Sequence, residues 1–252
     1  PELAGSGFAD STVRQVMDMT TGIDYSENYA DPQAEIWNHM RAGGVMPRPP
    51  GYSGPTHFYD YLQTVRKLGE HGEKFTYRTA NTDVLGWIVR RVSGQNTEHM
   101  LSERIWQPMG AELDAYYTVD PNGTAFAGGG LNTGLRDLAR FGELVRNHGR
   151  VGQTQVLPAA AVADTFAGAD PARFAANGPA TLAGWSYRNM WWVSHNAHGA
   201  IMARGVHGQN IYIDPKAEMV IARYASHPVA ANIANDPHTL PAYHALALAL
   251  LG

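Results

Sequence analysis

Hydrophobic residues recur at every third or fourth position in several stretches of the first 165 residues, which is the period of an amphipathic helix. Residues suited to N-capping stand at the start of two of these stretches. Ser11 or Thr12 would cap the helix over residues 11–19, and Thr133 would cap the helix over residues 133–149. The pattern predicts helices over residues 11–19, 34–40, 58–68, 82–92, 98–106 and 133–149, with a further helix from Pro158.

After about residue 185 the pattern changes to short apolar stretches separated by glycine and proline, which is typical of antiparallel strands. Strands are predicted over residues 190–193, 200–203, 209–213 and 219–224, a hairpin turn over 214–218 and a closing helix over 241–250. The fold class is therefore α+β. We expect a mainly helical region over residues 1–180 and an antiparallel sheet with a C-terminal helix over 181–252, packed as one domain.

Residues 25–56 are rich in proline, glycine, asparagine and tyrosine, and a loop of this length is more often functional than structureless. The loop carries Tyr25 and Tyr29, which makes both candidates for contact with a substrate.

The composition excludes several classes of partner and of catalytic group. The net charge is −4 and no basic run occurs, so neither nucleic acid nor an anionic membrane surface is an expected partner. The absence of cysteine excludes disulfides and thiolate nucleophiles but leaves the compartment open. The longest apolar run, over residues 245–251, is far shorter than the roughly 20 residues that span a bilayer.

Three segments together resemble the serine β-lactamase and penicillin-binding-protein superfamily, in its branch of esterases and amidases related to class C β-lactamases. They are Thr12–Gly22, the run Phe75-Thr76-Tyr77 followed by Asn81 and Leu85-Gly86, and Gly128–Phe141. The resemblance extends from residue 1 to about residue 228, and it implies a β-lactamase-like fold.

A narrower resemblance rests on Gly205–Gln209 and the pair Trp191-Trp192. These segments are most similar to the 6-aminohexanoate-dimer hydrolases, which cleave a linear amide made during nylon synthesis. The resemblance implies a serine that attacks the amide, a lysine and a tyrosine that move its proton, and backbone N–H groups that bind the oxyanion. It also implies a cytoplasmic enzyme without a cofactor, and a possible homodimer.

By this resemblance Tyr77 is the catalytic tyrosine and the Val206 N–H is an oxyanion donor. The residues expected to contact substrate are Tyr29, Trp192, Gly205 and His207. Other interpretations stay open: Tyr77 as a core tyrosine, the glycines around Val206 as ordinary turn residues, and Trp192 as sheet packing.

The serine and lysine of the family are not found in this sequence. Its three lysines are Lys67, Lys74 and Lys216. The segment most similar to Ser-x-x-Lys is Thr64–Lys67, but it lies between the long loop and the Tyr77 segment, which is the wrong order of motifs for the family. Pro1–Gly5 resembles the family segment that follows the nucleophile helix by a few tens of residues. The resemblance therefore implies that the N-terminal strands and the nucleophile helix lie upstream, on another chain or in sequence that precedes Pro1. That missing segment is the expected partner, and without it we expect exposed edges and association or aggregation.

The sequence departs from the family at two boxes. Thr79 stands where the Tyr-x-Asn box has asparagine, and the Lys-Thr-Gly box is absent, so recognition of a β-lactam is not expected. An esterase of the same fold, or a binding module that has lost its nucleophile, are the alternatives to an amide hydrolase.

Histidines offer a rival chemistry. His195, His198 and His207 are conceivable as a three-histidine zinc site. Because their spacing is loose and no glutamate adjoins them, we expect no metal.

Overall fold

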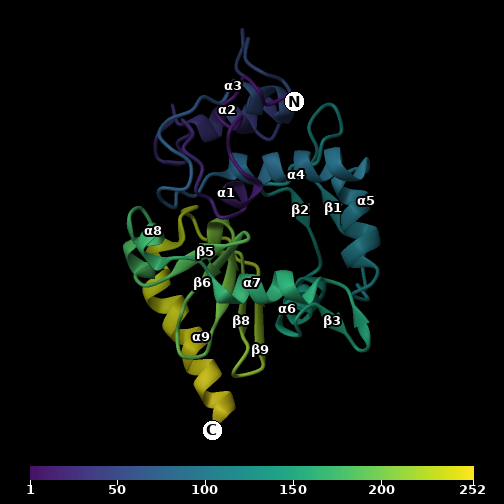
Figure 1. Cartoon of the computed structure of the whole chain (residues 1–252), viewed down its shortest axis with the longest axis vertical. Coiled ribbons are helices and arrows are strands. Elements are labelled where there is room, and N and C mark those ends of the chain that lie inside the picture. Colours follow the sequence, from purple (N-terminus) through teal and green to yellow (C-terminus); the bar gives the residue numbers. More distant parts are fainter. The chain divides into compact units, whose positions relative to one another are not determined.

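The computed structural model describes residues 1–252, which form two compact units (Figure 1). The first unit comprises residues 1–101 and 115–132, and the second comprises residues 102–114 and 133–252. Mixed helices and antiparallel strands confirm the α+β class. The units do not divide near residue 180, and the expected packing as one domain stays a prediction.

The first unit is mainly helical. Its elements are α1 (Val13–Met17), α2 (Glu35–Ala42), α3 (Phe58–Thr64), α4 (Thr79–Ser93), α5 (Thr97–Leu101) and the antiparallel pair β1 (Tyr116–Tyr117) and β2 (Leu131–Asn132). All five helices were predicted, with shifted ends. The helix predicted over residues 98–106 is divided into α5 and a π-helical turn over Ser102–Trp106.

Local chemistry explains where two of these helices begin and end. Thr12 caps α1, because its hydroxyl accepts from the Gln15 N–H and the Gln15 side chain accepts from the Thr12 N–H. Helix α3 stops at Thr64, since Val65 is extended and Lys67 pairs with Ile23 in an isolated β-bridge.

A buried polar group lies within the apolar core of the first unit. The His39 ring is fully buried, stacks on Tyr61 and shares a 2.9 Å hydrogen bond with the Tyr25 hydroxyl. Its Nε2 lies 3.3 Å from a carboxylate oxygen of Asp83, which is also buried. The same carboxyl group accepts from the Gly128 N–H, so the pair joins α2, α4 and the segment before β2.

The second unit is an antiparallel sheet with helices on both faces. The strands are β5 (Ser186–Arg188), β6 (Trp191–Val193), β7 (Ile201–Arg204), β8 (Asn210–Asp214) and β9 (Met219–Arg223), paired in that order. The helices are α6 (Leu135–Arg146), α7 (Ala159–Ala167), α8 (Pro171–Ala175) and α9 (Asp236–Leu251). A small hairpin, β3 (Arg150–Val151) and β4 (Thr154–Gln155), follows α6, and short 3₁₀ turns span Ala180–Leu182, Val206–Gly208 and Asn232–Ala234.

Alternation along the strands assigns the two faces. Val193, Ile201, Ile211 and Ile213 form a core with Val145 of α6 and Val162 of α7. The opposite face carries Tyr212, whose ring contacts Tyr243 of α9. The hairpin turn after β8 is confirmed, with the Ala217 N–H donating to Asp214.

Several details of this unit differ from the sequence pattern, which did not predict helix α8 or the β3–β4 hairpin. Thr133 was wrong as the N-cap of α6: Gly134 holds that position, and the Thr133 hydroxyl lies 2.5 Å from the Tyr224 hydroxyl instead. Strand β5 was not predicted. Helix α9 begins at Asp236, ahead of the predicted start, and includes Pro241.

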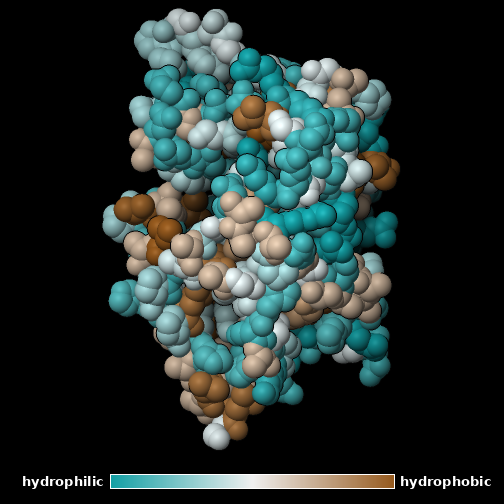
Figure 2. Space-filling view, turned by 60° about the vertical axis from the view of Figure 1, so that its left-hand side comes forward, coloured by the Kyte–Doolittle hydropathy of each residue, from teal (hydrophilic) through white to brown (hydrophobic).

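Helix α9 leaves part of its apolar surface uncovered. Leu246, Leu248, Leu250 and Leu251 are all exposed, and hydrophobic atoms gather at this end of the chain in Figure 2. None of the helices combines the length and apolar character needed to cross a bilayer.

Gly142 sets how closely α6 approaches the sheet. A Cβ atom at this position would lie 2.6 Å from Cγ1 of Val220 and 2.9 Å from Cγ2 of Ile211. Gly142→Ala should therefore lower the free energy of unfolding by about 1–3 kcal/mol through overpacking. Helix propensity alone would raise it by up to about 1 kcal/mol. Denaturant unfolding of the chain measures the difference.

Gly5→Ala is the matched control, because a Cβ atom at Gly5 meets nothing within 4 Å. It should leave stability unchanged or slightly raised. A Gly142→Ala chain as stable as the parent would show that the sheet can yield at this point.

The buried carboxyl group of Asp83 should make stability depend on pH. Burial raises its pKa to about 8, whereas burial lowers the pKa of His39 to about 3. A carboxyl group whose pKa is higher in the folded chain than in the unfolded chain stabilises the fold fully at a pH below its unfolded-state pKa. This stabilisation is lost as the pH rises through its folded-state pKa. His39 is neutral in the folded state, and in the unfolded state an imidazole with an ordinary pKa of about 6.5 is nearly all neutral only above about pH 7.5. From about pH 7.5 through about pH 8 the fall therefore comes from Asp83.

Asp83→Asn should flatten this part of the profile, measured by urea unfolding at stepped pH. Asp60→Asn, an exposed change in the same unit, should keep the parental slope. An unchanged slope in the Asp83 variant would contradict the assignment.

Candidate active site

Tyr77 lies in the extended segment that leads into α4, and its side chain is half-buried. Burial raises the pKa of its phenol above the ordinary value of about 10, and the negative charge of Glu27 raises it further. Within this chain, Tyr77 is therefore a neutral phenol that holds its proton. A role as a base would need a cation that opposes both effects.

Glu27 joins the long loop to the start of α4. One carboxylate oxygen accepts from the Thr79 N–H at 2.7 Å, and the other accepts from the Thr79 and Tyr29 hydroxyls, each at 2.7 Å. Burial raises the pKa of Glu27, and these hydrogen bonds oppose that rise. Tyr29 thus bonds to the half-buried carboxyl group of Glu27, and Tyr77 lies within reach of its charge.

Glu27 is not among the residues that the sequence pattern predicted for the site. One signal was available, because an acidic residue stands between Tyr25 and Tyr29 in a loop already suspected of function. The two tyrosines have different surroundings: Tyr25 is in the core against His39, whereas Tyr29 bonds to Glu27 and stacks edge-on to Trp37.

Arg78 is the cation next to Tyr77 in sequence, and it is committed to the backbone. Its guanidinium donates to the carbonyl oxygens of Tyr25 and Thr21, each at 3.0 Å. Burial lowers its pKa, and the charge of Glu27 partly offsets that effect. Arg78 therefore fixes the loop rather than offering a free charge.

Asn81, the displaced asparagine of the Tyr-x-Asn box, has a structural environment. It is fully buried, accepts from the Thr21 hydroxyl at 2.8 Å and donates to Sδ of Met19 at 3.2 Å. These bonds hold the turn that follows α1, where Met19 takes a positive φ of 54°.

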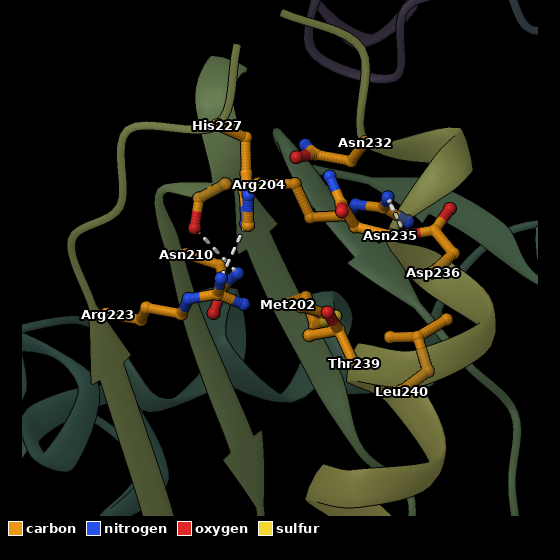
Figure 3. A pocket seen from close by; sticks show the side chains of 11 residues that line it. Met202, Arg204, Asn210, Arg223, His227, Asn232, Asn235, Asp236, Thr239 and Leu240 are labelled. Atoms are coloured by element: carbon orange, nitrogen blue, oxygen red, sulfur yellow. Dashed lines mark hydrogen bonds and ion pairs between the residues drawn. The ribbon is translucent and has the colours of Figure 1, made fainter. Parts of the chain in front are cut away.

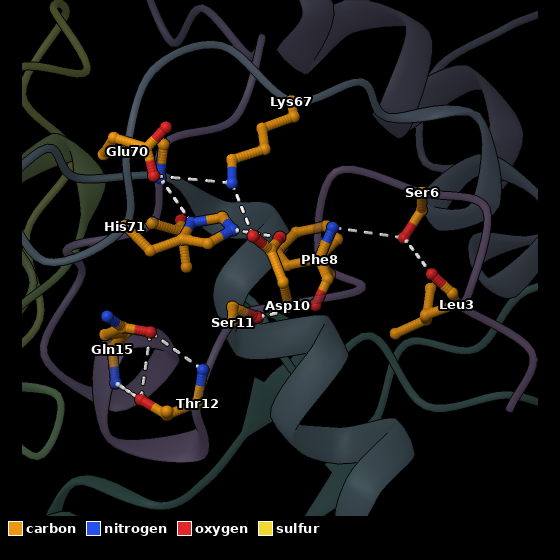
Figure 4. A network of polar contacts seen from close by, with 12 residues as sticks. Leu3, Ser6, Phe8, Asp10, Ser11, Thr12, Gln15, Lys67, Glu70 and His71 are labelled. Atoms are coloured by element: carbon orange, nitrogen blue, oxygen red, sulfur yellow. Dashed lines mark hydrogen bonds and ion pairs between the residues drawn. The ribbon is translucent and has the colours of Figure 1, made fainter.

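Thr64 and Lys67 do not form a nucleophile pair. The Thr64 hydroxyl donates to the Tyr61 carbonyl at 2.7 Å, within its own helix. Lys67 Nζ lies 2.5 Å from a carboxylate oxygen of Asp10, which His71 also contacts at 3.0 Å (Figure 4). Lys67 thus belongs to a surface ion-pair network.

In the second unit, Gly205–Gly208 turns the chain from β7 into β8. The N–H groups of Gly205 and His207 donate to the carbonyl oxygens of Gln209 and Ala230, at 2.8 Å and 3.0 Å. The Val206 N–H has no acceptor within the chain. A backbone donor without an internal partner is what an oxyanion site requires, and this role stays a prediction.

The turn owes its shape to left-handed backbone at two successive residues. His207 has a φ of 58°, and its ring Nδ1 lies 2.7 Å from the His227 carbonyl oxygen. Gly208 has a φ of 91°, and a Cβ atom there would approach the His227 ring to 2.2 Å. Glycine is required at this place for both reasons.

Trp192 is packed between neighbours on the α8 and α9 face of the sheet. Its ring contacts those of Phe174 and Tyr187 edge-on, and the Arg204 guanidinium lies 5.1 Å from its centroid. A small polar pocket lies alongside, where Arg204 pairs with Asp236 at 2.5 Å (Figure 3). The contact of Trp192 with substrate stays a prediction.

The three histidines of the rival zinc set have separate partners. His195 bonds to the Ser186 hydroxyl at 2.7 Å, His198 to Asp214 at 2.8 Å, and His207 to the His227 carbonyl.

Of the residues predicted to act on substrate, Tyr29 and Tyr77 belong to the first unit. The other four, Trp192, Gly205, Val206 and His207, belong to the second.

Comparison with known proteins agrees with the fold and the motifs. The beta-lactamase family model matches residues 1–246. A 6-aminohexanoate-dimer hydrolase from Paenarthrobacter ureafaciens is 39% identical over 229 residues, which are 90% of this chain and 58% of that protein. A solved structure from Bacillus anthracis, provisionally assigned as a 6-aminohexanoate-dimer hydrolase, has a TM-score of 0.87 and 34% identity.

The Bacillus anthracis match covers 99% of this chain and 64% of the other, so the chain spans about three fifths of both relatives. EstCE1, a hydrolase with promiscuous acyltransferase activity, shares the fold at a TM-score of 0.65 and 18% identity, covering 88% of this chain and 68% of its own. These matches confirm both resemblances that the sequence motifs indicated.

Glu27→Gln should lower the pKa of Tyr77, because it removes the negative charge while keeping an acceptor for Thr79. Ultraviolet titration of the tyrosines, carried from about pH 8 to the onset of alkaline unfolding, follows the change, and subtraction of a Tyr77→Phe titration isolates the Tyr77 signal.

Glu98→Gln is the control, since the Glu98 charge acts on Tyr117. It should leave the Tyr77 signal unmoved. If Glu27→Gln also leaves that signal unmoved, the electrostatic coupling is absent.

Proposed function

This chain belongs to the beta-lactamase family, and we propose that it forms the larger part of a serine hydrolase that cleaves a linear amide, similar to the 6-aminohexanoate dimer. The similarity to the Paenarthrobacter ureafaciens hydrolase supports this substrate class. The observation that carries the proposal is the pair of tyrosines, Tyr29 and Tyr77, near the half-buried carboxyl group of Glu27.

The reaction proceeds through an acyl-enzyme. As a serine oxygen bonds to the amide carbonyl carbon, the serine proton passes to the upstream lysine, and the Val206 N–H stabilises the oxyanion that develops. The C–N bond then breaks, and the departing amine takes a proton. Tyr77 is suited to supply that proton, because its surroundings keep the phenol neutral, and the lysine returns the serine proton to the phenol. Water hydrolyses the resulting ester and releases the acid.

The serine and a lysine come from a segment upstream of Pro1, as the family resemblance implies. A lysine ammonium close to Tyr77 would offset the charge of Glu27 and let the phenol pass its proton in both directions. The exposed leucines of α9 and the unpaired outer edges of β5 and β9 are surfaces that such a segment would cover.

Tyr77→Phe should reduce turnover by about 100- to 10,000-fold, because it removes a proton-transfer group. The test joins this chain to an upstream segment that carries Ser-x-x-Lys and measures release of 6-aminohexanoate from its linear dimer. Tyr116→Phe is the matched control, since Tyr116 is an exposed tyrosine of the same unit, and it should keep full activity.

Circular dichroism and the unfolding midpoint confirm that the Tyr77 variant is folded. Undiminished turnover by that folded variant would remove Tyr77 from the mechanism. Hydrolysis of a small ester without hydrolysis of the amide would favour the esterase. Hydrolysis of neither by the unaltered joined protein would favour a binding module.

A further inference from the structure

Three potential metal ligands converge where α9 meets the sheet of the second unit. His198 lies in the loop between β6 and β7, Asp214 ends β8, and His244 lies on α9. One nitrogen or oxygen atom from each of them falls within 4.8 Å of the others. The three residues are far apart in sequence, so the fold alone assembles the set.

Two of the ligands are already held in position. His198 Nδ1 lies 2.8 Å from Oδ2 of Asp214, and both side chains are buried. The other carboxylate oxygen of Asp214 accepts from the Ala217 N–H at 3.0 Å. Such an outer hydrogen bond orients a ligating carboxylate and fixes the direction of its free oxygen.

The third ligand has a buried polar atom without a partner. Nδ1 of His244 is inaccessible to solvent and makes no hydrogen bond, while its ring lies 4.9 Å from that of His198. Leaving a buried polar nitrogen unsatisfied costs about 1–3 kcal/mol. A metal ion that bound His244 through Nδ1 would give this nitrogen a partner.

We propose that His198, Asp214 and His244 form a binding site for a divalent transition-metal ion of the zinc type. Two imidazoles and one carboxylate are ligands that zinc accepts, whereas magnesium and calcium prefer oxygen alone. Tetrahedral zinc with bonds of about 2.0–2.1 Å needs its ligand atoms about 3.3 Å apart. The three side chains would have to move by roughly 1 Å, and water would take the fourth position.

The position of the cluster indicates a structural role. Ile201 pairs with Ile213 beside the cluster, whereas Arg204 pairs with Asn210 next to the Gly205–Gly208 turn. The cluster and that turn therefore lie at opposite ends of β7 and β8, about 10 Å apart along the strands. An ion here would fasten α9 to the sheet independently of the proposed hydrolase activity.

Isothermal titration with zinc chloride tests the site on the full chain, after treatment with a chelator. We expect one equivalent of zinc to bind per chain, with saturation. The thermal unfolding midpoint should rise with zinc concentration, because the ion binds the folded state.

His244→Gln should weaken zinc binding by at least about 10-fold. His238→Gln is the matched control: His238 lies exposed on the same helix, and its loss should leave affinity unchanged. Absence of saturable binding by the parent, or equal affinity in the His244 variant, would overturn the proposal.

A second measurement covers the case in which the His244 variant does not fold. Crystals of the unaltered chain soaked in zinc, measured at the zinc absorption edge, should show an anomalous peak between the three side chains. Peaks confined to other places would overturn the site.

Discussion

The half-buried carboxylate of Glu27 is the interaction that ties the long loop of the first unit to helix α4. Helix α4 begins at Thr79 without a side-chain cap from Arg78, so its first N–H needs an acceptor from elsewhere. Glu27 supplies it across 52 residues of sequence and places negative charge at the positive end of the helix. The loop over residues 25–56 is thereby tied to the segment that carries Tyr77.

The same carboxylate sets the chemistry of the nearby phenols. Burial and the charge of Glu27 both raise the pKa values of Tyr29 and Tyr77. The positive groups nearest in sequence do not oppose this, since Arg78 is bound to backbone carbonyls and Lys67 to Asp10. Both phenols therefore stay protonated at neutral pH, and ionisation of either would require a positive charge nearby.

Hydrophobic period predicted most of the helices and strands, because burial of one face is decided locally by the spacing of side chains. It failed where tertiary contacts override local preference. Thr133 has the chemistry of an N-cap, yet its hydroxyl bonds with Tyr224, which lies 91 residues away. Strand β5 is too short to show a period, and its pairing with β6 defines it.

The sequence by itself determined the α+β class, the family through its motifs, and the absence of Ser-x-x-Lys, since all three depend on residue identity and spacing. Tertiary structure decided which side chains meet. Histidines 195, 198 and 207 are close in sequence but have separate partners, while His198 finds Asp214 and His244. Glu27 likewise accepts a hydrogen bond from the Thr79 N–H, which is distant in sequence. Partners of buried polar groups depend on folding geometry, which spacing along the chain does not encode.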